Sequence, residues 1–134
     1  MTNVAEIEGV GPAYAEKLEA AGIHGVEGLL EAGGSRHGRK EIAESTGISD
    51  HLILKWVNHA DLFRINGVAG EYAELLEASG VDTVKELAQR NATHLQPKMA
   101  AVNEEKKVVR RVPSESEVER WVHEAKALPA RVEY

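Results

Sequence analysis

A segment of 24 residues near the N-terminus returns 58 positions later, and this duplication constrains the fold more than any other feature of the sequence. The first copy begins IEGVGPAYAEKLEAAGI at Ile7, and the second begins INGVAGEYAELLEASGV at Ile65. Twelve of the 24 positions are identical in one register, which is too many for chance in a chain of ordinary composition. We therefore expect two similar halves, residues 1–64 and 65–134, packed as one unit because each alone would be a marginal folder.

Each copy has the pattern of a tight turn that leads into a helix. GVGP (residues 9–12) and GVAG (residues 67–70) supply a backbone that can take positive φ and then enter a helix. In the first copy the helix places Ala15, Leu18 and Ala21 on one face and ends at Gly22, the usual position for a left-handed cap. The pattern resembles the helix-hairpin-helix motif, in which the hairpin N–H groups of DNA-binding members contact phosphates without reading bases.

The remainder of the first half predicts three more helices. They cover Ile23 to Ala32, Arg36 to Ser45 and Asp50 to Leu62, with Ser49 as the N-cap of the last. Ala43, Gly47 and Ile53 also have the spacing of a helix-turn-helix motif. The candidate recognition helix would show solvent only one firm cation among Asp50, His51, Lys55, Asn58 and His59. We therefore favour a second, degenerate hairpin that packs against the first.

The second half repeats this plan. Helices are expected from Gly70 to Ser79, Thr83 to Gln89, Asn91 to Val102 with a bend or restart at Pro97, and Glu115 to Leu128.

The last of these helices opens with a capping box, SESE, in which Ser114 is the N-cap and Glu117 the third helical residue. Its Trp121 corresponds to Trp56 at an offset of 65 instead of 58, so seven extra residues entered the second copy, near residues 104–112. The sequence KKVVRRV there is compatible with a short extended segment at 107–112. The tail from Pro129 to Tyr134 is expected to be loosely held.

The two hairpins are the first candidate binding sites. Their residues are Gly9, Val10, Gly11, Pro12, Gly67, Val68, Ala69 and Gly70. The glycines can serve there only to let two helices approach. Glutamates flank both hairpins, and their carboxylates occupy the field that an incoming phosphate would need. Ala69 in place of the second glycine weakens a phosphate site in the second copy further.

Basic residues form the second set of candidates. They are Arg36, Arg39, Lys40, Lys106, Lys107, Arg110 and Arg111. Such runs are most often solvated faces or partners of acidic helices in the same chain. The run at 106–111 could also dock on an acidic groove of another molecule or supply phosphate contacts. The net charge of the first half is negative: Met1 to Leu62 carries five Lys or Arg against ten Asp or Glu. This balance counts against general nucleic-acid affinity.

Other function classes have no support in the sequence. No two of the six histidines stand at i, i+4 with a carboxylate placed to complete a metal site, and the absence of cysteine removes thiolate zinc sites and thiol catalysis. We find no nucleophile elbow, phosphate-binding loop or dinucleotide fingerprint, and we therefore expect neither a cofactor nor a metal nor an enzyme activity. No apolar run approaches the ~20 residues of a membrane span, so a cytoplasmic protein that makes no membrane contact is expected.

From about Glu6 to Leu128 the order of motifs resembles a bacterial family, the domain of unknown function 4332. The segments that carry this resemblance are WVNHADLFRI and GEYAELLEASGVDTVKELA. The resemblance implies an all-α fold of two helix-hairpin-helix, SAM-domain-like repeats and implies no activity. We expect a non-catalytic interaction module that binds a protein partner through the acidic hairpin helices or the basic run. The alternative is sequence-independent binding to a DNA or RNA backbone through the first hairpin and nearby basic residues.

Overall fold

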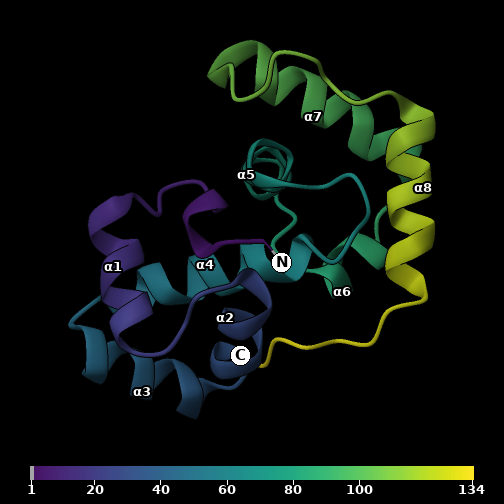
Figure 1. Ribbon diagram of the computed structural model, residues 1–134. Helices are drawn as coiled ribbons and strands as arrows, with labels where there is room; N and C mark the ends of the chain where they lie inside the picture. The colour runs from purple at the N-terminus through teal and green to yellow at the C-terminus, as the bar shows by residue number, and fades with distance from the viewer. Residues whose placement is uncertain (1) are drawn as a thin grey trace. The chain divides into compact units, whose positions relative to one another are not determined.

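The computed structural model describes residues 2–134, which fold into two compact units built from helices (Figure 1). Unit 1 comprises the chain up to Asp61 together with Arg131–Tyr134, and unit 2 comprises Leu62–Ala130. The change of unit lies three residues before the expected division at residues 64 and 65, and the last four residues belong to unit 1. All regular elements in residues 2–134 are helical, apart from one isolated bridge between Asn3 and Gly25, so the all-α prediction is confirmed.

The helices follow one another in the same order in both units. Unit 1 contains the 3-10 helix η1 (Val4–Glu6) and the α-helices α1 (Pro12–Ala20), α2 (Val26–Gly33), α3 (Arg36–Thr46) and α4 (Asp50–Leu62). Unit 2 contains α5 (Gly70–Ala78), α6 (Val84–Ala88), α7 (Ala92–Lys106) and α8 (Glu115–Lys126). Over residues 2–134, no helix combines the length and the apolar character that crossing a membrane would require.

The two duplicated segments have the same backbone conformation. Gly9 and Gly67 precede α1 and α5 with φ of +93° and +92°, values that L-residues rarely adopt. The valine after each glycine donates its N–H to the isoleucine two residues before that glycine, at 3.0 Å in both units. Two residues after the end of each helix stand Gly22 and Gly80, with φ of +88° and +91°. Each turn therefore depends on glycine at the same two places.

An aromatic pair lies at the centre of each unit. Trp56 on α4 and Trp121 on α8 are both about 1% exposed, as the apolar spacing of these helices predicted. Tyr14 meets Trp56 edge-on, with ring centroids 5.0 Å apart, and Tyr72 lies tilted against Trp121 at 5.4 Å. Each tyrosine thus packs on the tryptophan of its own unit, and aromatic pairs of this geometry stabilise beyond the area they bury.

The hairpin glycines lie directly over these tryptophans. A Cβ built on Gly9 would lie 3.6 Å from Trp56 Nε1, and one built on Gly67 would lie 3.5 Å from Trp121 Nε1. These are ordinary contact distances, so the glycine requirement comes from positive φ and not from crowding. The hairpins are thereby fixed to the core of their units.

Three local predictions differ from the structure. Helix α7 does not restart at Pro97 but runs from Ala92 to Lys106, because the proline removes a single helical bond while Leu95 and Met99 are buried on either side of it. Asn58 and His59, expected on the solvent side of α4, are buried. Residues 107–114, which include the expected extended segment, are non-helical and form no strand pairing.

Candidate functional site

Both hairpins are exposed except for the valine that anchors each of them. Gly9, Gly11 and Pro12 are exposed in unit 1, as are Gly67 and Ala69 in unit 2, whereas Gly70 is half-buried. The valines at positions 10 and 68 are buried in the core. The hairpins therefore lie at the surface, and each is anchored to the core of its unit by its buried valine.

Neither hairpin helix has a side-chain cap at its start. Gly11 and Ala69 occupy the N-cap positions of α1 and α5 without a side-chain hydrogen bond. The first N–H groups of an uncapped helix are open to an acceptor. The side chains of Glu8, Glu16 and Glu71 are exposed close by in the chain, and their carboxylates oppose a phosphate at the same place.

The first basic cluster is divided by burial. Arg36 and Lys40 are exposed on α3, whereas Arg39 is only 7% exposed. The Arg39 guanidinium donates to the carbonyl oxygens of Gly33 at 2.9 Å and Gly34 at 3.1 Å, and also to that of Glu133. Burial lowers the pKa of Arg39 from its usual value. Arg39 therefore binds backbone of its own unit and does not belong to the exposed basic surface that the sequence suggested.

The second basic cluster lies in what we term the cationic loop, residues 106–113. Its backbone is held by the side chain of Asn103 on α7. Asn103 Nδ2 donates to the carbonyl oxygen of Val109 at 3.0 Å, and Asn103 Oδ1 accepts the N–H of the same residue at 2.8 Å. One amide side chain thus pairs with both backbone groups of Val109 and fixes the loop to α7.

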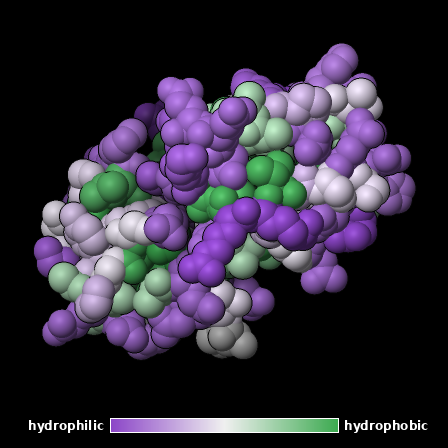
Figure 2. Space-filling view, turned by 90° about the horizontal axis from the view of Figure 1, so that it is seen from above, coloured by the Kyte–Doolittle hydropathy of each residue, from purple (hydrophilic) through white to green (hydrophobic). Residues whose placement is uncertain are grey.

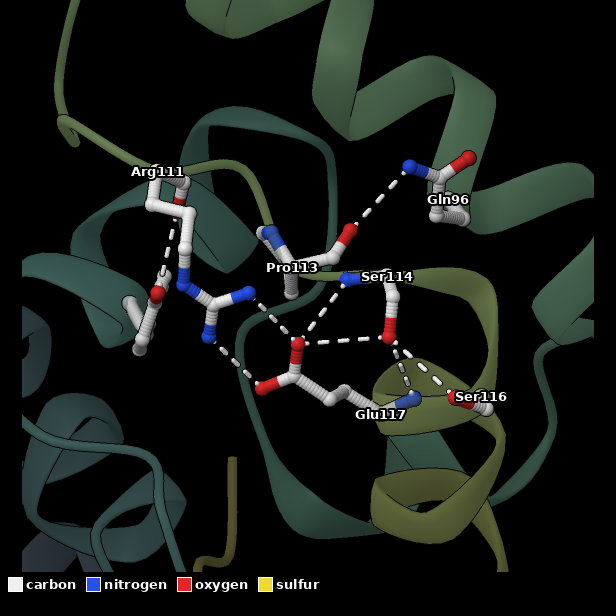
Figure 3. Close-up of polar contacts among 7 residues, drawn as sticks. Gln96, Arg111, Pro113, Ser114, Ser116 and Glu117 are labelled. Carbon is white, nitrogen blue, oxygen red and sulfur yellow. Dashed lines mark hydrogen bonds and ion pairs between the residues drawn. The ribbon is translucent and has the colours of Figure 1, made fainter.

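Two more hydrogen bonds fasten the far end of the loop (Figure 3). Gln96 on α7 donates from Nε2 to the carbonyl oxygen of Pro113 at 3.1 Å. The Tyr72 hydroxyl donates to the carbonyl oxygen of Arg111 at 2.9 Å. Because Tyr72 is two residues beyond Gly70, the loop lies beside the helix that the second hairpin begins.

The valines of KKVVRRV turn inward. Val109 is 6% exposed and belongs to the core of unit 2, and Val108 and Val112 are partly buried against that core. The side chains of Lys106, Lys107 and Arg110 are exposed in consequence, and none of the three forms an ion pair within residues 2–134. The alternation of valine and cation therefore anchors the loop on one side and presents charge on the other.

Arg111 has a different role from the other three cations. Its guanidinium forms a two-point ion pair with the Glu117 carboxylate, at 2.8 and 2.9 Å (Figure 3). Glu117 also accepts the N–H of Ser114, whose hydroxyl accepts the N–H of Glu117, so the expected capping box is formed. The hydrogen bonds from Arg111 lower the pKa of Glu117 to about 2, and the same pairing raises the pKa of Arg111. Arg111 thus ties the loop to the start of α8.

Sequence reasoning identified the cations of this loop but not the residues that position them. Gln96 and Asn103 hold the loop in place and stand in no motif, and Tyr72 belongs to the duplicated segment, whose pattern does not indicate a contact with the loop. Only the uneven spacing of the two tryptophans indicated that an additional segment lies here. The partners of these polar side chains are backbone groups, which carry no sequence signal.

The outer surface offers charge more than apolar area. Hydrophilic residues cover most of the face shown in Figure 2. Among the described residues, Tyr134 is the large hydrophobic side chain that is exposed, at 59%. A partner at this surface would therefore be recognised chiefly through charged and polar groups.

No curated protein and no solved structure matches the chain significantly. The family described as domain of unknown function (DUF4332) matches residues 8–128, which is nearly the whole chain and includes both hairpins, the cationic loop and α8. The chain therefore belongs to the DUF4332 family.

Proposed function

We propose that this protein is a non-catalytic interaction module, built from two helix-hairpin-helix units, that binds an acidic surface of a partner protein through the cationic loop. The observation that carries the proposal is that the backbone of this loop is held in one conformation. Asn103, Gln96 and Tyr72 fix its backbone, while Lys106, Lys107 and Arg110 extend from it. A preorganised charged segment loses little conformational entropy when it binds, which favours recognition.

The helix-hairpin-helix description has its own support. In both units a glycine with φ near +90° precedes a helix that has no side-chain cap, and a second such glycine follows that helix. The hydrogen bond that closes each helix is also repeated: Ile23 N–H donates to Leu18 and Val81 N–H donates to Leu76, both at 2.9 Å. Two segments with the same glycines and the same bonds fit a tandem arrangement of this motif.

Charge favours a protein partner over a nucleic acid. Residues 62–130, which form unit 2, carry ten Lys or Arg against eleven Asp or Glu, so no broad basic field surrounds the loop. A protein that binds nucleic acid through its phosphates usually neutralises several of them at once. Three outward cations among many carboxylates suit a local acidic patch on a protein better.

Affinity capture with a charge-reversed loop tests this proposal. The purified protein is immobilised, and the retained proteins are quantified for the wild type and for Lys106→Glu with Lys107→Glu. A matched control carries Lys85→Glu with Lys98→Glu, two exposed lysines on α6 and α7. We expect the wild type and the control to retain the same acidic proteins, and we expect the loop variant not to retain them. Equal retention by all three proteins would refute a role for the loop.

A second candidate function is sequence-independent binding to a nucleic-acid backbone at the first hairpin. The observation in its favour is the uncapped start of α1, where Gly11 leaves the first N–H groups without a side-chain acceptor. The substitution Gly11→Asp separates this function from folding. Gly11 has φ of −80°, and a Cβ there would meet no atom within 4 Å, so aspartate fits and should cap the helix.

Titration into a fluorescent DNA duplex and a single strand decides this second candidate. Backbone binding should weaken steeply between low and physiological salt. It should also disappear in Gly11→Asp, because the aspartate carboxylate takes the N–H groups and repels phosphate. If the wild type binds neither strand at low salt, or if Gly11→Asp binds as the wild type does, the hairpin is not a phosphate site.

A further inference from the structure

The C-terminal tail of the chain is held by hydrogen bonds to α3, to α4 and to the turn that joins α2 to α3. It was expected to be loosely held, but Glu133 N–H donates to the carbonyl oxygen of Gly34 at 2.7 Å, and Arg39 donates to the carbonyl oxygen of Glu133. The Tyr134 hydroxyl donates to Asn58 Oδ1 on α4 at 3.2 Å. The tail is non-helical, and unit 1 thus holds a peptide segment between the turn that joins α2 to α3 and the surface of α4.

The turn in unit 1 is shaped for this segment. A Cβ built on Gly34 would lie 2.6 Å from the carbonyl oxygen of Arg131, a distance that real Cβ atoms do not show. Only glycine allows the backbone of the tail to come so close. Gly34 and Arg39 together form a seat that receives the tail.

The corresponding place in unit 2 is an open groove. Helix α8 corresponds to α4, since Trp121 corresponds to Trp56, and the N-cap Asn91 of α7 corresponds to the N-cap Ser35 of α3. Between the α6–α7 turn and α8 lies a groove with a volume of about 920 Å³. Its polar and charged lining includes Arg90, Asn91, Thr93, Arg120, His123 and Lys126.

The charge of this groove is positive. Arg120 and Lys126 are exposed on α8 and form no hydrogen bond or ion pair within residues 2–134. Arg90 donates one N–H to the carbonyl oxygen of Gly80 at 3.3 Å, and the other N–H groups of its guanidinium are available to a ligand. Glu119 is the one carboxylate in the lining. Three cations against one carboxylate select an acidic occupant.

The residues that contact the tail in unit 1, Gly34 and Arg39, have different counterparts in unit 2. Counted from the N-caps, Arg90 stands where unit 1 has Gly34, and the buried Leu95 stands where unit 1 has Arg39. The cation that binds the tail in unit 1 therefore has no counterpart on α7. In unit 2 the cations come from the turn and from α8, where they can reach the side chains of an occupant as well as its backbone.

We infer that the groove between the α6–α7 turn and α8 binds a non-helical, acidic segment of a partner protein, in the way that unit 1 holds the tail of its own chain. This site is separate from the cationic loop, so it stands whether or not the loop binds a partner. Backbone hydrogen bonds to the turn would hold the segment, and Arg90, Arg120 and Lys126 would select its carboxylates.

Fluorescence anisotropy with a defined probe tests this inference. The probe is a fluorescein-labelled nonapeptide in which glutamate alternates with valine, and the control peptide has lysine in place of glutamate. The groove variant is Arg120→Glu with Lys126→Glu. The matched variant, Lys85→Glu with Lys98→Glu, makes the same change of charge at two exposed lysines that line neither the groove nor the cationic loop. All four positions are exposed, so the fold should tolerate each change.

We expect the wild type to bind the acidic peptide and not the basic one at physiological salt. The groove variant should bind it about tenfold more weakly or worse, whereas the matched variant should change the affinity by less than about twofold. Amide shifts in the wild type should concentrate at residues 89–93 and 116–126. Absent binding, or an equal loss in both variants, would overturn the inference. So would a DNA duplex that binds the groove where the acidic peptide does not.

Discussion

The amide side chain of Asn103 offers the most direct test of how the cationic loop is held. In Asn103→Ala the two hydrogen bonds to Val109, at 2.8 and 3.0 Å, are lost together, while α7 keeps a residue of high helix propensity. The substitution leaves every cation of the loop in place. It therefore separates the order of the loop from its charge.

The cost can be worked out along two routes. If the loop keeps its place, the N–H and carbonyl of Val109, a residue only 6% exposed, remain buried without partners, at about 1–3 kcal/mol each. If the loop detaches, water satisfies both groups, but the burial of the valine, worth about 1.5–3 kcal/mol, is lost, and the freed loop regains some entropy. The second route costs less and therefore sets the expected loss in the free energy of unfolding, about 1–3 kcal/mol.

Urea denaturation measures this loss, and amide hydrogen exchange locates it. The amide of Val109 should exchange much faster in Asn103→Ala, while the amides of Leu95 and Met99 in α7 keep their protection relative to global unfolding. Glu104→Ala, an exposed neighbour on the same helix, is the control and should stay within about 0.5 kcal/mol of the wild type. An unchanged exchange rate at Val109, or a loss below about 0.5 kcal/mol, would refute this account of the loop.

Four further predictions concern stability. Trp56→Ala should lower the free energy of unfolding by about 3–5 kcal/mol, and a loss below about 1 kcal/mol in a denaturation curve would contradict its core position. Gly67→Val should cost at least about 1–2 kcal/mol because a β-branched side chain is strained at φ of +92°; an unchanged melting temperature would remove the hairpin assignment. Lys107→Gly should raise stability by about 0.5–1 kcal/mol, since Lys107 has φ of +52° at the end of α7, and no gain would show that the strain is absorbed elsewhere. The pKa of Glu117 is lowered from 4.5 to about 2, so its ion pair stabilises the fold fully above about pH 5. The excess stability of the wild type over Glu117→Gln should therefore fade as the pH drops from 4.5 toward 2. A difference in the free energy of unfolding that stays constant with pH would exclude the pairing.

The parts of the fold that local chemistry decides were predictable from the sequence. Glycine at positions 9 and 67 indicated turns because few other residues take positive φ, and both turns are present. Ser49 and Ser114 stand at helix starts with side chains that accept N–H groups, as their patterns indicated. Trp56 and Trp121 are buried because each lies on the apolar face of its helix.

The parts that depend on distant partners were not predictable. Arg39 looked like one more cation of an exposed run, but its guanidinium binds a carbonyl oxygen 94 positions away in the chain. The tail had no pattern that distinguishes a docked segment from a free one. Asn103 binds the backbone of Val109, and a backbone acceptor has no side-chain identity to recognise. These contacts follow from the arrangement in space, which local propensity does not encode.

Comparison of the two units shows where the duplicated chain has diverged. From the hairpins as far as Leu29 and Leu87 the offset stays at 58 residues, and the backbone hydrogen bonds of the hairpins and of the ends of their helices match in both units. Beyond it, α6 has five residues against eight in α2, and three residues link α6 to α7 where two link α2 to α3. Helix α7 has 15 residues against 11 in α3, and the link before α8 is longer by five. The extra residues are therefore divided between the end of α7 and the cationic loop.

These changes lie at the two surfaces for which we propose partners. The altered link before α7 places Arg90 at the groove in unit 2, where unit 1 has the glycine that contacts the tail. The lengthened link provides the cationic loop, whereas unit 1 joins α3 to α4 with only three residues. The hairpin and the aromatic pair that support the core have kept their geometry in both units. Because a second copy is free to change where it does not hold the core, new binding chemistry in a duplicated fold is expected at such links. In this chain Arg90 in one altered link, and Lys107 and Arg110 in the other, form no ion pair within residues 2–134.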